Sequence, residues 1–214
     1  MIVLVVASAL LLLAAALGTG ASGGLVWDLL NGAGFAACAL YVHLSWVSAS
    51  PARQPGLDMH SALAIWVCLF ATVHGLGLLL LDATLLEYLQ PDAPLYMHAG
   101  LASLVVLILL TRVSFPTARQ HVWRDWPAFR NWHRWLWIVL LGGIAWHVIG
   151  AGFYLDTPAS RTLGIAALVL LPIAFWVDRR RPGTRREHRP GAAFNTATAL
   201  VAVLASLAFA VLRA

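Results

Sequence analysis

The chain is poor in charged residues. Of its 214 residues only 11% are charged, whereas 61% are hydrophobic and the mean hydropathy is +0.81. A soluble domain of this size carries about 25% charged and roughly 45–50% apolar residues. We therefore expect an integral membrane protein, with no room for a sizeable soluble domain beside the apolar segments.

Lysine is absent and cysteine is scarce. All 14 basic residues are arginine, which together with the many Ala, Leu and Trp residues is typical of a GC-rich bacterial genome. The two cysteines, Cys38 and Cys68, both lie inside apolar segments. This placement argues against a disulfide framework and against a thiolate metal site.

Several catalytic and binding motifs are also missing. No glycine-rich dinucleotide or phosphate motif follows a candidate strand, so flavin or nicotinamide chemistry must come from another chain. No paired carboxylates or nucleophile–base set supports hydrolytic or group-transfer chemistry. The arginines lie on loops beside apolar segments, a pattern that does not favour nucleic-acid binding.

Long apolar runs dominate what is present, and a span needs roughly 20 residues to cross a hydrocarbon core of about 30 Å. We predict an all-α fold, a polytopic membrane helix bundle of about seven transmembrane helices. No positively charged region precedes the first run, which favours a retained helix over a signal peptide. The runs cover residues 2–18, 26–49, 60–81, 95–112, 133–155, 161–177 and 191–212.

The loops alternate in charge. Loop 82–94 holds three acidic residues and no arginine, whereas loops 113–132 and 178–190 are rich in arginine. Because arginine-rich short loops stay in the cytoplasm, we predict a bacterial inner membrane protein with a cytoplasmic N-terminus and a periplasmic or extracellular C-terminus. Loop 178–190 is interpreted as a topology anchor, and docking of an acidic partner or of lipid headgroups is the alternative.

Four histidines share one spacing. His60 and His74 are 14 positions apart, and so are His133 and His147. In a helix, 14 residues rise about 21 Å and turn through about 1400°, within roughly 40° of four full turns. Each helix therefore presents two imidazoles on one face, one near each side of the membrane. Beyond this spacing we detect no internal repeat.

Topology predicts how these histidines pair. Only segment 95–112 lies between the two histidine-bearing segments, so these run in the same direction. His60 should then face His133 near the cytoplasm, and His74 should face His147 near the outside. Paired neutral imidazoles from facing helices are the usual ligands of a six-coordinate haem, and without a C-x-x-C-H motif we expect two non-covalent haem b groups.

A simpler interpretation of these histidines is interhelical hydrogen bonding. Two pairs with equal spacing and matching depth favour ligation instead, because ionisable residues inside spans are costly and usually functional.

Four further residues are candidate partners of haem propionates. Arg134 directly follows His133, and Arg130 lies one turn earlier. Guanidinium groups bind carboxylates bidentately, although boundary arginines also extend towards lipid headgroups. His43 and His98 have a suitable depth as well, but for these two we favour plain interfacial residues.

One stretch resembles a known family. Residues 107–150, LILLTRVSFPTARQHVWRDWPAFRNWHRWLWIVLLGGIAWHVIG, are similar to the central part of ferric-reductase-like transmembrane domains. That group includes the membrane half of NADPH oxidases and iron reductases, and the haem membrane subunit serving periplasmic methionine sulfoxide reductase. The shared pattern is a helix ending near Thr111 and Ser114, then arginines, then Trp132-His133-Arg134. Trp135 stands where the family has leucine.

The resemblance covers roughly residues 25–178 and implies a six-helix core with two haem b groups. By this likeness the axial ligands are His60, His74, His133 and His147. Residues 1–24 would form the first helix and an outer loop, and residues 179–214 an arginine-rich cytoplasmic loop plus an extra helix. Electrons would move from the cytoplasmic haem to the outer one. The chain has no flavin domain, so a separate flavoprotein or a membrane quinol would supply them.

The expected function is transmembrane electron transfer, from a cytoplasmic or membrane donor to an acceptor on the outer side. The chain would be the haem-bearing subunit of an oxidoreductase, with lipid and a separate redox protein as partners. No catalytic residue of its own is expected. The first alternative is a quinol-oxidising cytochrome b subunit of a larger complex. The second is a non-redox membrane protein whose histidines join helices.

Overall fold

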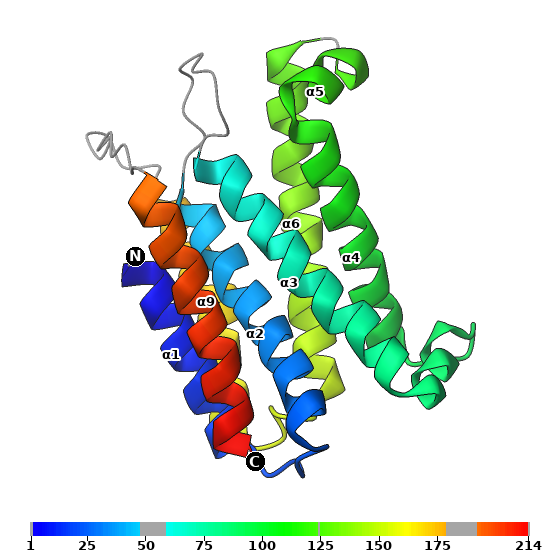
Figure 1. Cartoon of the computed structure of the whole chain (residues 1–214). Coiled ribbons are helices and arrows are strands. Elements are labelled where there is room, and N and C mark those ends of the chain that lie inside the picture. Colours follow the sequence, from blue (N-terminus) through cyan, green and yellow to red (C-terminus); the bar gives the residue numbers. More distant parts are fainter. Residues whose placement is uncertain (1, 48–58, 124, 179–191, 214) are drawn as a thin grey trace.

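The computed structural model describes residues 2–47, 59–123, 125–178 and 192–213, and within these ranges the chain forms helices and connections without any strand. The described part of each apolar run is mainly helical (Figure 1). The long elements are α1 (Ile2–Leu17), α2 (Leu25–Trp46), α3 (Met59–Leu81), α4 (Leu95–Ser114), α6 (Trp126–Ala151), α7 (Pro158–Ile165) with η2 (Ala166–Leu170) and α8 (Leu171–Asp178), and α9 (Ala192–Arg213). Two short elements, η1 (Ala83–Leu89) and α5 (Pro116–Val122), lie in connections.

Four helices, α2, α3, α4 and α6, are long and apolar enough to cross a membrane. Many of their large apolar side chains point outwards, including Leu80, Leu109 and Val139. The all-helical class is therefore confirmed, and the four helices indicate a membrane protein. Helix α1, the α7–α8 run and the apolar part of α9 are shorter. Seven spans and a six-helix core therefore stay predictions.

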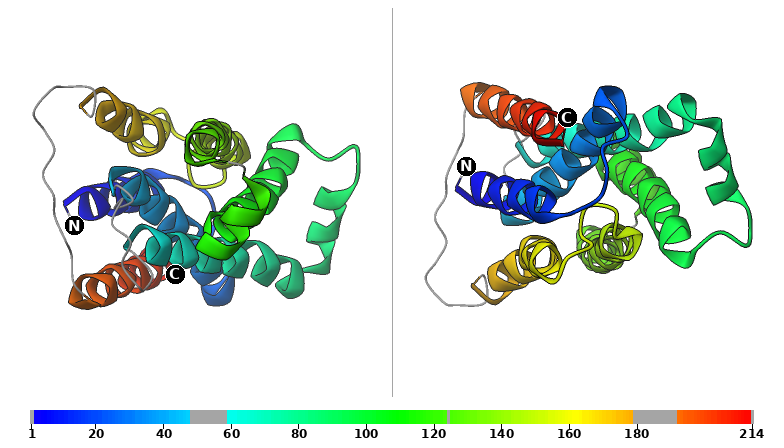
Figure 2. Two further views of the ribbon diagram at one scale, coloured as in Figure 1. Left: turned by 90° about the horizontal axis from the view of Figure 1, so that it is seen from above. Right: turned by 90° about the horizontal axis from the view of Figure 1, so that it is seen from below.

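The helices form a bundle with distinct ends. Helix α2 packs against α1, α3 and α9, and α4 packs against α3 and α6. Seen end on, α1, α9 and the α7–α8 run lie on one side and α4 with η1 on the other (Figure 2). Helix α5 lies at one end of the bundle, and the C-terminus and η1 lie at the opposite end (Figure 1).

Helix α6 begins earlier than the apolar run at 133–155 suggested. It starts at Trp126, directly after Asp125, whose side chain accepts a hydrogen bond from the backbone N–H of Ala128. A carboxylate at this position satisfies one of the unpaired N–H groups of a helix start. The helix ends at Gly152, which has a positive φ of 62°. His133 consequently lies two turns inside the helix.

The sixth apolar run is one continuous helical path with an irregular middle. Thr157 and Ser160 form a reciprocal capping box at its start. The π-helical turn η2 ends directly before Leu171 and Pro172. Proline lacks the N–H that an α-helix needs at this point, and a π turn accommodates that loss without ending the run.

Polar contacts join the chain at the end opposite α5. The carboxyl group of Asp28 is fully buried and accepts hydrogen bonds from Tyr154 Oη, at 2.8 Å, and from Ser22 Oγ. Arg213 donates to the backbone carbonyls of Ala15 and Gly18, each at 3.1 Å. These contacts fasten the ends of α1, α2 and α9 to the loop that follows α6.

Candidate functional site

The four histidines of α3 and α6 meet in two pairs. The ring centroids of His60 and His133 are 6.0 Å apart, and those of His74 and His147 are 6.4 Å apart. These are the pairs that two parallel helices were expected to form. His60 and His133 lie near the α5 end of the bundle, and we call them the inner pair. His74 and His147 lie near the η1 end and form the outer pair.

Backbone carbonyls hold three of the four rings. Nδ1 of His74 lies 3.1 Å from the carbonyl oxygen of Leu30, and Nδ1 of His147 lies 3.1 Å from that of Tyr96. Nδ1 of His60 makes the same contact with Val47, also at 3.1 Å. Because a carbonyl only accepts, Nδ1 must carry the proton in each case. The lone pair therefore lies on Nε2, the arrangement of a metal-binding histidine.

Glycines give the outer pair the space it needs. A Cβ on Gly34 of α2 would lie 2.9 Å from ring atoms of His74, and a Cβ on Gly100 of α4 would lie 2.5 Å from Nδ1 of His147. Real Cβ atoms do not approach this closely. Each imidazole thus rests against the backbone of a supporting helix, α2 for His74 and α4 for His147.

Helices α2 and α4 support the outer histidines with the same spacing between an accepting carbonyl and a glycine. In each, the carbonyl that accepts from histidine lies four residues before the glycine, as in Leu30 and Gly34 or Tyr96 and Gly100. Residues 30–48, LNGAGFAACALYVHLSWVS, align without a gap to residues 96–114, YMHAGLASLVVLILLTRVS. The two stretches share an Ala-Gly step and a Leu-[Ser/Thr]-x-Val-Ser step, and the glycine of the first step is the trace that the supporting residues leave in the sequence.

His133 differs from the other three histidines. Its Nδ1 is buried and has no hydrogen-bond partner among the described residues. The ring of Phe129, one turn earlier in α6, has its centroid 5.2 Å from that of His133. The inner pair is thus anchored through His60 alone.

The pair geometry fits one metal ion between two imidazoles. Metal–nitrogen bonds to histidine measure about 2.0–2.1 Å, and a ring centroid lies about 1.2 Å behind its nitrogen, so two such rings in line have centroids roughly 6.4 Å apart. The observed 6.0 and 6.4 Å agree with this value. No group of three or more His, Cys, Asp or Glu side chains converges in the described ranges. The pairs therefore suit an ion that brings its remaining ligands in a macrocycle.

The other predicted site residues occupy different surroundings. His43 lies in the last turn of α2 and is only 4% exposed, so its side chain is enclosed by the protein. His98 is half-buried in the first turn of α4. Arg130 and Arg134 are exposed near the start of α6. A role of these four residues towards propionates stays a prediction.

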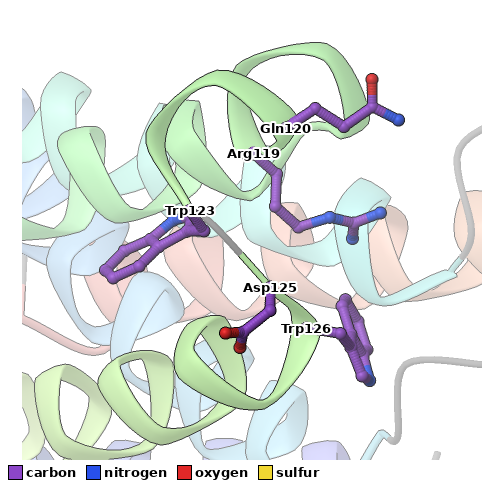
Figure 3. A pocket seen from close by; sticks show the side chains of 5 residues that line it. All are labelled: Arg119, Gln120, Trp123, Asp125 and Trp126. Atoms are coloured by element: carbon purple, nitrogen blue, oxygen red, sulfur yellow. The ribbon is translucent and has the colours of Figure 1, made fainter.

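Aromatic rings connect a surface cavity to the inner pair. The cavity has a volume of about 270 Å³ and lies where α5 meets α6 (Figure 3). The guanidinium of Arg119 stacks 4.7 Å from the centroid of the Trp126 ring. The Trp126 ring lies 5.3 Å from that of Phe129, which in turn contacts His133. The cavity is lined by Arg119, Gln120, Trp123, Asp125 and Trp126.

Comparison with known proteins adds no assignment. No family model matches the chain, and no curated protein or solved structure matches it. The likeness of residues 107–150 to ferric-reductase-like domains is therefore an expectation from the sequence alone. The function has to be argued from the chemistry of the two histidine pairs.

Proposed function

We propose that this chain is the haem-bearing membrane subunit of an electron-transfer system. One b-type haem would be held between His60 and His133, and a second between His74 and His147. The observation that carries the proposal is the pair geometry, in which centroids 6.0 and 6.4 Å apart match two imidazoles on one iron. Carbonyl contacts that place the proton on Nδ1 and leave the lone pair on Nε2 support the same conclusion.

The bound haem supplies one-electron chemistry, and the chain supplies its ligands and surroundings. Val67 lies seven residues from both His60 and His74, and Leu140 lies seven residues from both His133 and His147. Both apolar side chains are only 1% exposed. These two side chains therefore exclude water from the space between the two histidine pairs. The helix rise separates the pairs by about 21 Å.

The proposed direction of electron flow rests on charge and on the family resemblance. Arg112 in the last turn of α4, Arg119 in α5 and Arg130 near the start of α6 support a cytoplasmic assignment for the end that carries α5. Electrons would enter at the inner pair from a flavoprotein or quinol and leave from the outer pair. The outer acceptor would be a ferric chelate, oxygen, a flavin-bearing protein or an oxidised periplasmic enzyme.

A quinol-oxidising cytochrome b subunit is the second candidate. The observation behind it is an open surface depression of about 530 Å³ beside α4 and α5, a volume within the range of about 300–1,000 Å³ of small-molecule sites. Reduction of the haems by a quinol analogue in proteoliposomes, blocked by a quinone-site inhibitor, would establish the quinol-oxidising function. Reduction by a flavoprotein alone would establish the electron-transfer subunit proposed first. The depression is lined by Arg112, Val113, Thr117, Ala118, His121 and Val122.

The proposal is tested by haem content. Protein purified from haem-replete cells should show a b-type absorption band, and the pyridine haemochrome assay should give two haems per chain. His74→Ala and His147→Ala should each leave one haem. His121→Ala, in the exposed part of α5, is the matched control and should keep both. A colourless wild-type preparation contradicts the proposal.

A further inference from the structure

The two histidine pairs are not equally well supported, and this difference has a functional consequence if the proposed haem sites are correct. We propose that the outer pair, His74 and His147, retains haem more tightly than the inner pair, His60 and His133. Both outer rings are fixed by a backbone carbonyl and a glycine, whereas His133 has neither support in the described chain.

The alignment of α2 with α4 indicates which carbonyl would be the equivalent acceptor for His133. His60 donates to the carbonyl of Val47, and Val113 stands at the equivalent place in α4, 66 positions later. Leu30 and Tyr96, the acceptors of the outer pair, differ by the same 66 positions. The carbonyl of Val113 is thus the expected partner of His133.

The two helices end differently at these equivalent positions. Helix α2 ends at Trp46, and Val47 has an extended backbone with φ −94° and ψ 114°. Helix α4 continues to Ser114, so Val113 remains in its last turn. Nδ1 of His133 has no hydrogen-bond partner among the described residues, so the inner site has no counterpart to the contact between His60 and Val47.

An unsatisfied Nδ1 weakens a histidine ligand in two ways. The ring is not fixed in the orientation that binds metal, and Nε2 is a poorer donor because no acceptor polarises Nδ1–H. Loss of such a partner typically lowers metal affinity 10–100-fold. We expect a difference of this size between the two sites.

The experiment uses full-length proteins with one site each. The double variant H60A/H133A keeps only the outer pair, and H74A/H147A keeps only the inner pair. Each is loaded with one haem and mixed with excess apomyoglobin, and transfer is followed by absorbance. The outer-only protein should lose haem about 10–100-fold more slowly. Equal rates, or slower loss from the inner-only protein, would overturn the inference.

A glycine substitution tests whether the contact between His74 and the carbonyl of Leu30 causes the slower haem loss from the outer site. Gly34→Ala in the outer-only protein should push His74 away from Leu30 and raise the rate of haem loss towards that of the inner-only protein. Gly142→Ala is the matched control, because a Cβ there meets nothing within 4 Å, and it should leave the rate unchanged. An unchanged rate in Gly34→Ala contradicts this cause.

Wild-type protein provides the measurement if a double variant does not fold. Its haem loss should show two phases of equal amplitude, of which His133→Ala removes the fast one. A single phase overturns the inference and leaves two haems per chain intact. Absence of haem from wild-type protein would instead contradict the proposed function itself.

Discussion

The imidazole of His147 lies directly against Gly100 of α4, where a Cβ would come 2.5 Å from Nδ1. The same nitrogen contacts the carbonyl oxygen of Tyr96, at 3.1 Å, one turn earlier on α4. The two contacts depend on each other, since the ring reaches the carbonyl only because position 100 has no side chain. Main-chain atoms of α4 thus set the orientation of a histidine on α6.

Gly100→Ala should therefore damage the outer site while the helices remain intact. The added methyl group displaces His147 from Tyr96, and we expect haem affinity at the outer site to fall about 10–100-fold. Titration of haem into the apoprotein, followed by the Soret band, measures this. Gly142→Ala on α6 adds the same group in open space and should bind normally. Wild-type affinity in Gly100→Ala would show that the ring does not need this support.

The fold and the histidine pairs were largely predictable from the sequence. Apolar runs located the helices, because burial in lipid requires long uninterrupted apolar segments. The pairing of His60 with His133 followed from counting the one span between them. Helix ends were harder, and α6 begins at Trp126 because Asp125 caps it, a signal that hydropathy does not contain.

The supporting atoms were not predictable in the same way. The groups that fix His74 and His147 are backbone carbonyls, which every residue possesses, so no residue type marks them. Only the glycines leave a trace in the sequence, and Gly34 and Gly100 stand among many small residues. The buried place of His43 also depends on packing between helices, which its position near a helix end did not reveal.

Tyr154→Phe should destabilise the outer end of the bundle. Burial, and then the hydrogen bond to Asp28, raise the pKa of Tyr154, so its hydroxyl stays protonated and donates to the buried carboxyl group. Removing this donor leaves part of Asp28 unsatisfied, which costs about 1–3 kcal/mol. Unfolding in detergent, followed by circular dichroism, measures the change. Tyr88→Phe in η1 removes a hydroxyl elsewhere and should have little effect; equal losses in both variants would contradict the argument.

Arg213→Met should loosen the contact between α9 and the end of α1. The guanidinium donates to the carbonyl of Ala15, in the last turn of α1, and to that of Gly18, directly after the helix. Loss of these charge-assisted bonds should cost about 1–3 kcal/mol. Chemical unfolding in detergent gives the value. Arg213→Lys keeps the charge without the planar guanidinium, so it should recover only part of the stability.

Stability should depend weakly on pH through Asp156. The hydroxyl of Thr19, and then its backbone N–H, hold the pKa of Asp156 below its usual value of 3.8. Because the folded pKa is the lower one, this stabilisation is complete above pH about 4 and is lost as the pH falls through the folded value.

Asp156→Asn should accordingly melt slightly below wild type at pH 7, and the two melting temperatures should converge as the pH falls below the folded pKa of Asp156. The effect is small because the group is exposed. Melting curves of both proteins between pH 7 and pH 3 test this, and a difference that stays constant over that range would exclude Asp156 as its source.

The π turn at Ala166–Leu170 has a mechanical consequence for the shorter helical run. A widened turn shifts every later side chain around the axis, so the faces of α7 and α8 do not form one straight stripe. α7 contacts α1, whereas α8 contacts α2. A single irregular turn thus lets one helix change neighbours halfway along its length. Straightening it by replacing Pro172 with an ordinary helix former would rotate one half away from its present neighbour.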